Sequence, residues 1–410
     1  MDIKFLGGAE EVGKVSALIN PNPRITLLFD YGFVPSKPPS YPAKAPKVDC
    51  AFLTHGHLDH SGMMPSLAAR YGMDIVASPP TSALMELLSF DALKVAKREG
   101  YDAQYTKEDI IFALSKVQSI GEEIVIDDFM VRGHDAGHIP GSTMYTIEGD
   151  GVALFTGDLN DKDTRLLRGA KPIKCNLLLI ESTYAGSEHP PRDKVEKEFL
   201  ARVDETVQNG GLAVVPAFAV GRAQELLLLL HEKGYQVYMD GMGIRVTKIL
   251  SSFPDYLKDA DLLKNALGGV KKVKNNGDRK KALKGEVVLT TSGMLDGGPV
   301  LWYLEKIKND PKSGVFLTGY QVEGSRGRTL MEEGVIDIDG AISPLKCNVA
   351  FFDFSAHADH SGLLKFIKDC DPEKVILFHG EKREKIREDI GDRYEVILPK
   401  NGETLHIDLI

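Results

Sequence analysis

One short segment of this sequence concentrates residues that bind metal ions. Three of the eleven histidines fall between positions 55 and 60, where they accompany Asp59. Packing rarely explains so tight a cluster, and imidazole nitrogen and carboxylate oxygen are the expected ligands of divalent zinc. His55 and His57 can face one metal ion from extended backbone, while Asp59 and His60 can face a second. Two ions roughly 3.5–4 Å apart can clamp a phosphodiester.

A two-metal site needs more ligands than this segment supplies, and three further candidates follow strand-like stretches. His138 lies among glycines that let the backbone pass close to a site. Asp158 follows Phe155-Thr-Gly, and its carboxylate can bridge two ions. His379 follows a run of apolar residues. Each alone has a structural interpretation, as a hydrogen-bonded histidine or a turn-capping aspartate. Together with the first cluster, the set favours a metal site.

Apolar runs that stop at polar residues predict the strands that position these side chains. Such runs end at Asp30, at His55 and at Asp158. Residues 144–155, with Glu148-Gly-Asp-Gly at the centre, are typical of a β-hairpin. Residues 81–97 are typical of a helix, for which Thr81 or Ser82 is the expected cap. The first 180 residues therefore predict a mixed α and β domain.

The second half of the chain has a different pattern. From about Pro190, helices and short apolar strands alternate regularly, which is typical of a parallel α/β domain. After Pro344 the mixed pattern returns, with apolar runs that end before His357 and His379. We therefore expect an α/β domain inserted into a split outer domain.

A six-residue pattern occurs twice. His57-Leu-Asp-His-Ser-Gly62 recurs as His357-Ala-Asp-His-Ser-Gly362. The second copy has Ser355 where the first has His55, so it lacks a full ligand set, and we expect His360 to be structural. Two explanations remain open: a strand-to-helix junction used twice, or a duplicated half-domain.

Composition narrows the class of protein. The longest apolar runs, such as Leu226 to Leu230, fall far below the roughly 20 residues that span a bilayer. The amino-terminal residues lack the features of a secretory signal, so we expect a cytoplasmic protein without a membrane span. The four cysteines form no Cys-x-x-Cys pair and are predicted to be buried free thiols. A net charge of −9 argues against a broad basic nucleic-acid surface, but bound metal ions could still attract phosphate locally.

These motifs resemble a known family. Asp30, the segment from His55 to His60, His138 and Asp158 match, in order, the four motifs of the metallo-β-lactamase superfamily. Three further segments resemble its β-CASP branch, and they are centred on Glu181, His357 and His379. The resemblance covers essentially the whole chain. Within that branch the sequence resembles the archaeal relatives of the cleavage and polyadenylation specificity factor nuclease, with ribonuclease J as a cousin.

The resemblance implies a fold and a mechanism. The fold would be α/β, with a metallo-β-lactamase αββα sandwich at residues 1–187 and 350–410, split by a parallel α/β β-CASP domain at residues 188–349. Two Zn²⁺ ions would be held by seven ligands: His55, His57 and His138 on one ion, Asp59, His60 and His379 on the other, with Asp158 bridging both. Asp30 would orient a ligand histidine, His357 would protonate the leaving oxygen, and Glu181 would hold the ring of His357. Attack by hydroxide would give 5′-phosphate and 3′-hydroxyl ends.

The resemblance also implies a substrate. Histidine at position 379 favours the RNA-cutting branch, so single-stranded RNA is the expected partner, cut internally or trimmed from the 5′ end. An Artemis-type DNA nuclease, an inactive scaffold subunit of an RNA-processing complex and a hydrolase of small esters are the alternatives, and a homodimer remains open. Glycine-rich loops of the inserted domain could bind substrate phosphates. The candidates are Gly221, Arg222, Ser292, Gly293, Ser325 and Arg326.

Two other features of the inserted domain have competing interpretations. The stretch from Lys271 to Lys284 carries seven Lys or Arg residues. It could guide RNA, although such a run is more often a solvated surface. Trp302 is expected in a helix core or a subunit contact rather than in a base-stacking platform.

Overall fold

The computed structural model describes residues 1–121, 123–338 and 340–409. The chain divides into two compact units. Unit 1 contains residues 1–163, 168–188 and 357–410, and unit 2 contains residues 164–167 and 189–356. Residues 350–356 belong to unit 2 because the strand at Asn348–Phe351 continues the sheet of that unit.

Unit 1 contains two seven-stranded sheets. The strands of the first sheet are, in spatial order, β22 (Thr404–His406), β1 (Asp2–Gly7), β2 (Ser16–Asn20), β3 (Leu27–Phe29), β4 (Cys50–Phe52), β5 (Asp74–Ala77) and β6 (Val117–Ser119). The strands of the second sheet are β21 (Glu395–Ile397), β20 (Lys374–Phe378), β11 (Leu177–Glu181), β10 (Val152–Phe155), β9 (Thr143–Glu148), β8 (Phe129–Asp135) and β7 (Ile124–Ile126).

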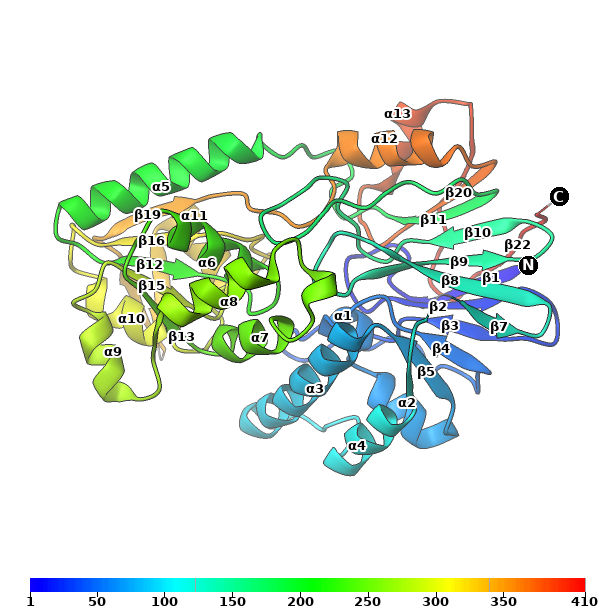
Figure 1. The fold of residues 1–410 in the computed structure, drawn as a ribbon, viewed down its shortest axis with the longest axis horizontal. Coiled ribbons are helices and arrows are strands. Elements are labelled where there is room, and N and C mark those ends of the chain that lie inside the picture. The colour runs from blue at the N-terminus through cyan, green and yellow to red at the C-terminus, as the bar shows by residue number, and fades with distance from the viewer. Residues whose placement is uncertain (122, 339, 410) are drawn as a thin grey trace. The chain divides into compact units, whose positions relative to one another are not determined.

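Helices cover the outer faces of both sheets (Figure 1). Those of the first sheet are α1 (Leu58–Ser61), α2 (Met64–Tyr71), α3 (Pro79–Glu99) and α4 (Lys107–Ser115). Those of the second sheet are α12 (His360–Cys370) and α13 (Arg383–Ile390). One apolar cluster fills the space between the sheets, where Phe29 stacks on Phe52 and Phe155 stacks on Phe378. Two more clusters join each sheet to its helices. The predicted αββα sandwich is therefore confirmed.

Parallel strand pairs bring the chemically important residues to one edge of each sheet. In the first sheet β3 pairs with β4, and Asp30 follows the end of β3. In the second sheet β10, β11 and β20 are parallel neighbours that lead to Asp158, Glu181 and His379. Because parallel strands end at the same edge of a sheet, their terminal side chains can converge.

The predicted hairpin and first long helix are both present, with one correction. The hairpin consists of β9 and β10, which pair antiparallel. The helix, α3, begins earlier than expected, and its cap is Ser78 rather than Thr81 or Ser82. The hydroxyl of Ser78 accepts a hydrogen bond from the backbone N–H of Thr81 (3.3 Å). Pro79 and Pro80 fill the first turn, where a missing N–H costs little.

Unit 2 contains a six-stranded sheet in which every pair is parallel. Its order is β14 (Lys271–Lys272), β13 (Val237–Asp240), β15 (Val287–Thr290), β12 (Ala213–Pro216), β16 (Gly314–Leu317) and β19 (Asn348–Phe351). A separate pair is formed by β17 (Val335–Ile338) and β18 (Ala341–Pro344). The predicted parallel α/β domain is confirmed.

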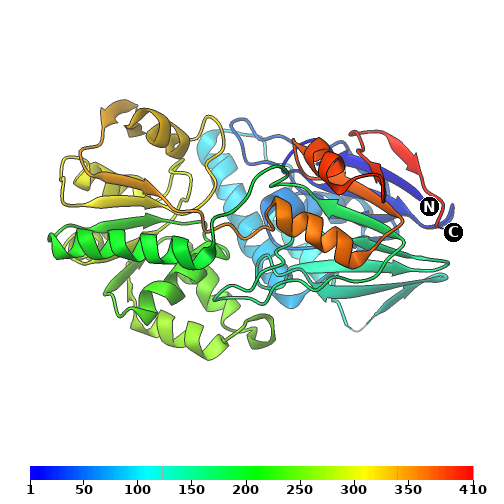
Figure 2. The same ribbon diagram turned by 90° about the horizontal axis from the view of Figure 1, so that it is seen from above.

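The helices of unit 2 alternate with these strands. They are α5 (Arg192–Gln208), α6 (Arg222–Glu232), α7 (Gly243–Leu250), the 3₁₀ turn Pro254–Tyr256, α8 (Ala260–Gly269), α9 (Asn276–Ala282), α10 (Val300–Ile307) and α11 (Arg326–Glu333). The long helix α5 packs along β12 and β16 (Figure 2). Trp302, on α10, packs against an apolar cluster of this unit, in agreement with a core role.

The two copies of the repeated six-residue pattern lie in different contexts. In the first copy both the strand and the helix belong to unit 1, whereas the second copy follows β19 of unit 2 and opens α12 of unit 1. His360 lies 2.8 Å from a carboxylate oxygen of Asp389 and accepts a hydrogen bond from the N–H of Gly186. These contacts support a structural role for His360 and favour a reused junction over a duplicated half-domain. Among the described residues, no helix combines the length and apolar character that a membrane crossing requires.

Candidate metal centre

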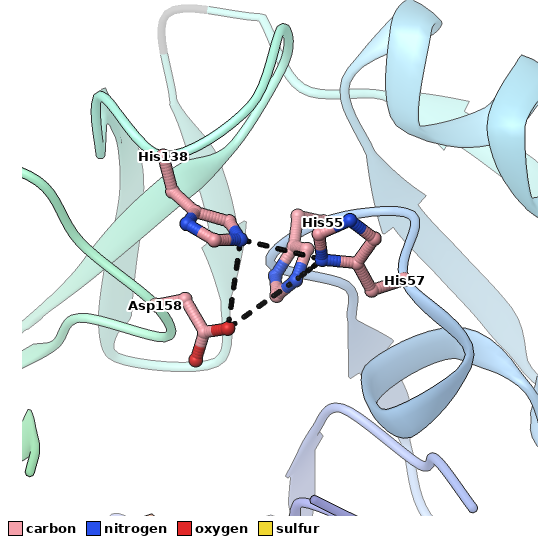
Figure 3. Close-up of side chains that lie close together, drawn as sticks. All are labelled: His55, His57, His138 and Asp158. Atoms are coloured by element: carbon pink, nitrogen blue, oxygen red, sulfur yellow. Dashed lines mark hydrogen bonds and ion pairs between the residues drawn. The ribbon is translucent and has the colours of Figure 1, made fainter. Parts of the chain in front are cut away.

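Four side chains of unit 1 form a first group of potential metal ligands (Figure 3). They are His55, His57, His138 and Asp158, and their ligand atoms lie within 4.8 Å of one another. Nδ1 of His57 is 3.0 Å from Nε2 of His55 and 3.3 Å from Nε2 of His138. Both Nε2 atoms are 3.6 Å from Oδ2 of Asp158. A tetrahedral zinc site with bonds of about 2.0–2.1 Å spaces its ligands about 3.3 Å apart, so this group fits one divalent ion.

A second group lies on the other side of Asp158. It contains Asp59, His60 and His379, again with ligand atoms within 4.8 Å. Oδ1 of Asp158 is 3.3 Å from Nε2 of His60, so the carboxylate turns one oxygen to each group. Three buried atoms here make no well-directed hydrogen bond among the described residues: Nε2 of His60, Nε2 of His379 and Oδ1 of Asp158, although the first and last form the ion pair just described. Because such orphaned atoms are costly, their convergence indicates a cation that satisfies them.

The protonation of the first group suits a metal ion. Burial and the neighbouring His60 hold the pKa of His55 well below its ordinary value, and burial also lowers the pKa of His57. Burial opposes ionisation of Asp158, but the charges of His60 and His379 hold the pKa of its carboxyl well below the usual range. Neutral imidazoles and an ionised carboxylate are the forms that bind metal.

Asp30 forms a hydrogen bond with the ring nitrogen of His60 that points away from Asp158. Its Oδ2 accepts a hydrogen bond from Nδ1 of His60 (2.7 Å) and another from the hydroxyl of Thr54 (2.7 Å). Its Oδ1 accepts from the backbone N–H of Thr54 (2.7 Å). Asp30 is fully buried, and its φ of 58° is unusual for a residue other than glycine. This arrangement leaves Nε2 of His60 directed at Asp158, as a partner behind a metal ligand would.

Backbone hydrogen bonds fix the loop that carries the candidate ligands Asp59 and His60. The N–H of Val15 donates to the carbonyl of Asp59 (2.8 Å), and the N–H of Tyr31 donates to the carbonyl of His60 (2.7 Å). Gly32 lies so close that a Cβ atom added to it would be 1.8 Å from the carbonyl oxygen of Asp59. Position 32 therefore needs a residue without a side chain.

We expect Gly32→Ala to displace this loop, lowering both the midpoint of thermal unfolding and the metal content. The clash is with backbone, so the cost should lie near the upper end of the usual 1–3 kcal/mol of overpacking, about 3 kcal/mol. Gly268→Ala, in α8, is the matched control because, apart from its chain neighbours and the backbone of its own helix, no described atom lies within 4 Å of its added Cβ. Calorimetry and elemental analysis of both variants provide the measurement. An unchanged midpoint for Gly32→Ala would contradict the expected strain.

A histidine–carboxylate pair adjoins the first metal-ligand group. Nδ1 of His357 donates to Oε1 of Glu181 (2.8 Å), and Nε2 of His357 is 4.0 Å from Oδ2 of Asp158. Glu181 is completely buried and also accepts from the N–H of Leu159 (3.0 Å). Burial would lower the pKa of His357, but Glu181, Asp158 and Asp59 together raise it to about 9. A protonated His357 can therefore donate a proton at this position.

Two threonines connect these groups, and sequence reasoning missed both. The hydroxyl of Thr54 bonds to Asp30 and lies 3.1 Å from Nδ1 of His55. The hydroxyl of Thr183 lies 3.0 Å from Nδ1 of His379, and its N–H donates to Oε2 of Glu181 (3.0 Å). The only signal in the sequence is their position, immediately before His55 and two residues after Glu181.

We expect Thr183→Val to weaken metal binding and catalysis together, because the ring of His379 loses its hydroxyl partner. Loss of a residue that orients a ligand typically costs 10–100-fold in affinity or activity, and we expect a decrease of about that size. Thr183→Ser keeps the hydroxyl and should retain near-normal behaviour. Competition with a chromogenic chelator and initial rates measure the two effects. Equal values for the valine and serine variants would show that the hydroxyl has no such role.

The candidate phosphate-binding residues all lie in unit 2, in loops after the carboxyl ends of its strands. Gly221 precedes α6 with a φ of 75°, and Arg222, the first residue of that helix, is buried. Ser325 caps α11, and its hydroxyl already accepts from the N–H of Arg328 (3.2 Å). Gln321 joins two of these loops through a hydrogen bond from its amide to the carbonyl of Gly293 (3.1 Å).

The other phosphate-binding candidates are Arg326 and Ser292, which lie in unit 2 together with the basic stretch. The N–H of Arg326 donates to the carboxylate of Asp296 (3.0 Å). Ser292 follows a cis peptide bond from Thr291. In the basic stretch from Lys271 to Lys284, Arg279 pairs with Asp240 (2.7 Å), and most of the lysines are exposed.

The sandwich, the two groups of potential ligands and the histidine–carboxylate pair beside them define a class, the metal-dependent hydrolases of the metallo-β-lactamase fold. Sequence models of three families match the chain. They are the metallo-beta-lactamase superfamily at residues 12–174, the Beta-Casp domain at residues 223–330 and the Zn-dependent metallo-hydrolase RNA specificity domain at residues 343–399. The chain therefore belongs to the β-CASP branch of the metallo-β-lactamase family.

Similar proteins match nearly the whole chain. A probable RNase, MJ4, of Methanocaldococcus jannaschii is 35% identical over 99% of this chain and 100% of its own length. The RNase aCSPSF2 of Saccharolobus solfataricus is 36% identical over 99% of this chain and 85% of its own. The transcription termination factor FttA of M. jannaschii is 35% identical over 93% of this chain and 67% of its own.

A solved structure supports the fold independently. A protein of unknown function from Enterococcus faecalis V583 superimposes with a TM-score of 0.61, covering 98% of this chain and 99% of that chain. The two sequences are 15% identical, so this similarity concerns the fold alone.

Proposed function

We propose that this chain is a ribonuclease that uses two zinc ions to hydrolyse phosphodiester bonds in single-stranded RNA. The observation that carries the proposal is Asp158, whose two carboxylate oxygens face two separate groups of ligand atoms. A two-metal arrangement suits in-line displacement at phosphorus because it can stabilise both the attacking and the leaving oxygen.

Each residue then has a defined role. His55, His57 and His138 would hold one ion, Asp59, His60 and His379 the other, and Asp158 both. Bound zinc supplies a water molecule whose pKa is lowered to about 7, together with positive charge beside the phosphate. Asp30 would fix the ring of His60, and thereby the direction of its Nε2 atom.

His357 would act as the general acid. With Nδ1 tied to Glu181, its Nε2 atom would carry the proton and pass it to the departing 3′ oxygen of the ribose. Glu181 would keep the ring in place and favour its protonated form. The products would carry a 5′-phosphate and a 3′-hydroxyl.

RNA is favoured over other substrates by the relatives and by the sequence. Two similar proteins are described as RNases, and a model for an RNA specificity domain matches residues 343–399. An inactive scaffold subunit is disfavoured because every ligand position is occupied by a suitable side chain. A small-ester hydrolase would leave the pair of His357 and Glu181 without a purpose.

We also propose that the loops of unit 2 contact the substrate backbone, with Gly221, Arg222, Ser292, Gly293, Ser325 and Arg326 as candidates. Units 1 and 2 would then be the metallo-β-lactamase and β-CASP domains of this chain. The cytoplasmic location expected from the sequence stays a prediction, and the homodimer stays open.

The test is cleavage of three substrates by the purified, zinc-loaded chain: 5′-labelled RNA, DNA of the same sequence, and a chromogenic ester. Cleavage of RNA alone, lost on chelation and restored by zinc, is the expected result. Preference for DNA would support the Artemis-type alternative, and no cleavage with two bound ions per chain would support a scaffold. RNA carrying either a 5′-monophosphate or a 5′-triphosphate, with product lengths followed in time, separates internal cutting from trimming.

A further inference from the structure

Two of the four free cysteines share one part of unit 1, away from the ligand groups. Cys175 lies two residues before β11, and Cys370 is the last residue of α12. Both side chains are buried in the apolar cluster that joins α12 and α13 to the second sheet. Cys50 and Cys347 belong to two other clusters. The pair is therefore distinguished from the remaining thiols by its location.

Contacts on both sides of Cys175 bring the two thiols together. Lys174 forms an ion pair with Asp371 (3.6 Å), the residue after Cys370. On the other side, the amide of Asn176 donates to the carboxylate of Glu373 (2.8 Å), and its carbonyl accepts from the N–H of Glu373 (2.9 Å). The chain on each side of Cys175 is thus bonded to the chain that follows Cys370, and both thiols lie in the same apolar cluster.

Their environments make the two thiols chemically unequal. The neighbouring Cys175 thiol lowers the pKa of Cys370 against the opposing effect of burial, whereas the neighbouring Cys370 thiol, together with burial, raises the pKa of Cys175. Because the thiolate is the reactive form of cysteine, Cys370 is the nucleophile of the pair and Cys175 the resolving thiol.

We propose that Cys175 and Cys370 are a redox modification site, where a small peroxide converts the two thiols into a reversible intramolecular disulfide. The Cys370 thiolate attacks an oxygen of hydrogen peroxide, the O–O bond breaks, and a sulfenic acid and hydroxide result. The sulfur of Cys175 then attacks the Cys370 sulfur, and the S–O bond breaks. The two departing hydroxides take up the two thiol protons, so two thiols and one peroxide give a disulfide and two waters. A dithiol reductant reverses the change.

The disulfide would join positions 195 residues apart (370 − 175), and the enclosed loop contains residues 189–356, the larger of the two segments of unit 2. Cross-links that close long loops stabilise a fold mainly by restricting the unfolded chain. The two segments are already bonded to each other in the native fold, so Glu181 and His357 should keep their positions. Oxidation is therefore expected to raise the unfolding midpoint by on the order of 5 °C while leaving activity unchanged.

The experiment treats the full, zinc-loaded chain with hydrogen peroxide, then counts free thiols after denaturation and maps disulfide-linked peptides by mass spectrometry. The expected result is a decrease from four thiols to two, one peptide pair that links Cys175 to Cys370, and a raised midpoint that dithiothreitol reverses. The Cys50→Ser/Cys347→Ser variant should behave in the same way, whereas Cys175→Ala should form no linked pair.

Four thiols remaining after native-state oxidation would overturn the proposal, as would linkage through Cys50 or Cys347 or between two chains. Peptide mapping of the unaltered protein decides the matter even where the Cys175→Ala variant folds poorly. The outcome does not depend on whether the chain cleaves RNA.

Discussion

Asp158→Asn is expected to lose RNA cleavage by on the order of 10³-fold or more and to bind fewer than two metal ions per chain. Asparagine has nearly the same shape as aspartate but carries no charge, so both ligand groups lose the anion that faces them. Two-metal catalysis contributes several kcal/mol of transition-state stabilisation, and about 1.4 kcal/mol corresponds to a factor of ten in rate. Initial rates on labelled RNA and elemental analysis measure the two effects.

The matched control is Asp389→Asn. Asp389 also pairs with a histidine, His360, at 2.8 Å, but on α13 and outside both ligand groups. This variant should keep its metal and its activity. If Asp158→Asn retained full activity and both ions, the bridging role would be wrong. The same conclusion would follow from full activity in an Asp59→Ala/His60→Ala variant, which removes two ligands of the second group.

The second large effect is expected for His357→Ala. A positioned general acid typically contributes 10²–10⁴-fold, and we expect a loss of about that size at unchanged metal content, since His357 would supply a proton rather than a ligand. Gel-based cleavage rates and metal analysis of the same preparation give the comparison. His134→Ala is a suitable control because His134 lies on β8, where it contacts Thr146 (3.2 Å) rather than the metal centre.

A modified substrate separates proton donation from a merely structural role of His357. In RNA with sulfur in place of the bridging 3′ oxygen, the leaving group departs as a thiolate and needs no proton. The ratio of unaltered to His357→Ala rates should then fall toward one. A ratio as large as that on ordinary RNA would mean that His357 acts otherwise than as an acid.

The strand-end residues that the structure brings together could be picked out because they stand out by type and spacing. Histidines at positions 55, 57 and 60 are conspicuous, and the strands that precede Asp30 and Asp158, β3 and β10, end close to where their apolar runs end. The two-unit organisation followed from the change in hydrophobic pattern near Pro190. In these cases the residue types at the strand ends and the hydrophobic pattern around them indicated the same structure.

Other features depend on contacts that no local pattern records. Thr183 is important because β11 and β20, some 197 residues apart at Leu177 and Lys374, are neighbours in the sheet. The cap of α3 was predicted wrongly because the sequence offers two possible helix starts. One is Ser78 followed by two prolines, which the structure uses, and the other is Thr81 or Ser82. Ser325 was predicted to bind substrate phosphate, but its hydroxyl caps its own helix, α11. A hydroxyl at the start of a helix can do either, and the sequence does not distinguish the two.

The chain order of the ligands has a consequence for biosynthesis. If the ligands are as proposed, the first group is complete once residue 158 has been made, whereas the second waits for His379, another 221 residues later (379 − 158). During translation the amino-terminal part can therefore present one metal site long before the other exists. If two ions are bound as proposed, we expect the nascent chain to take them up in sequence, and to leave RNA uncut until unit 2 has been made and β20 has paired with β11.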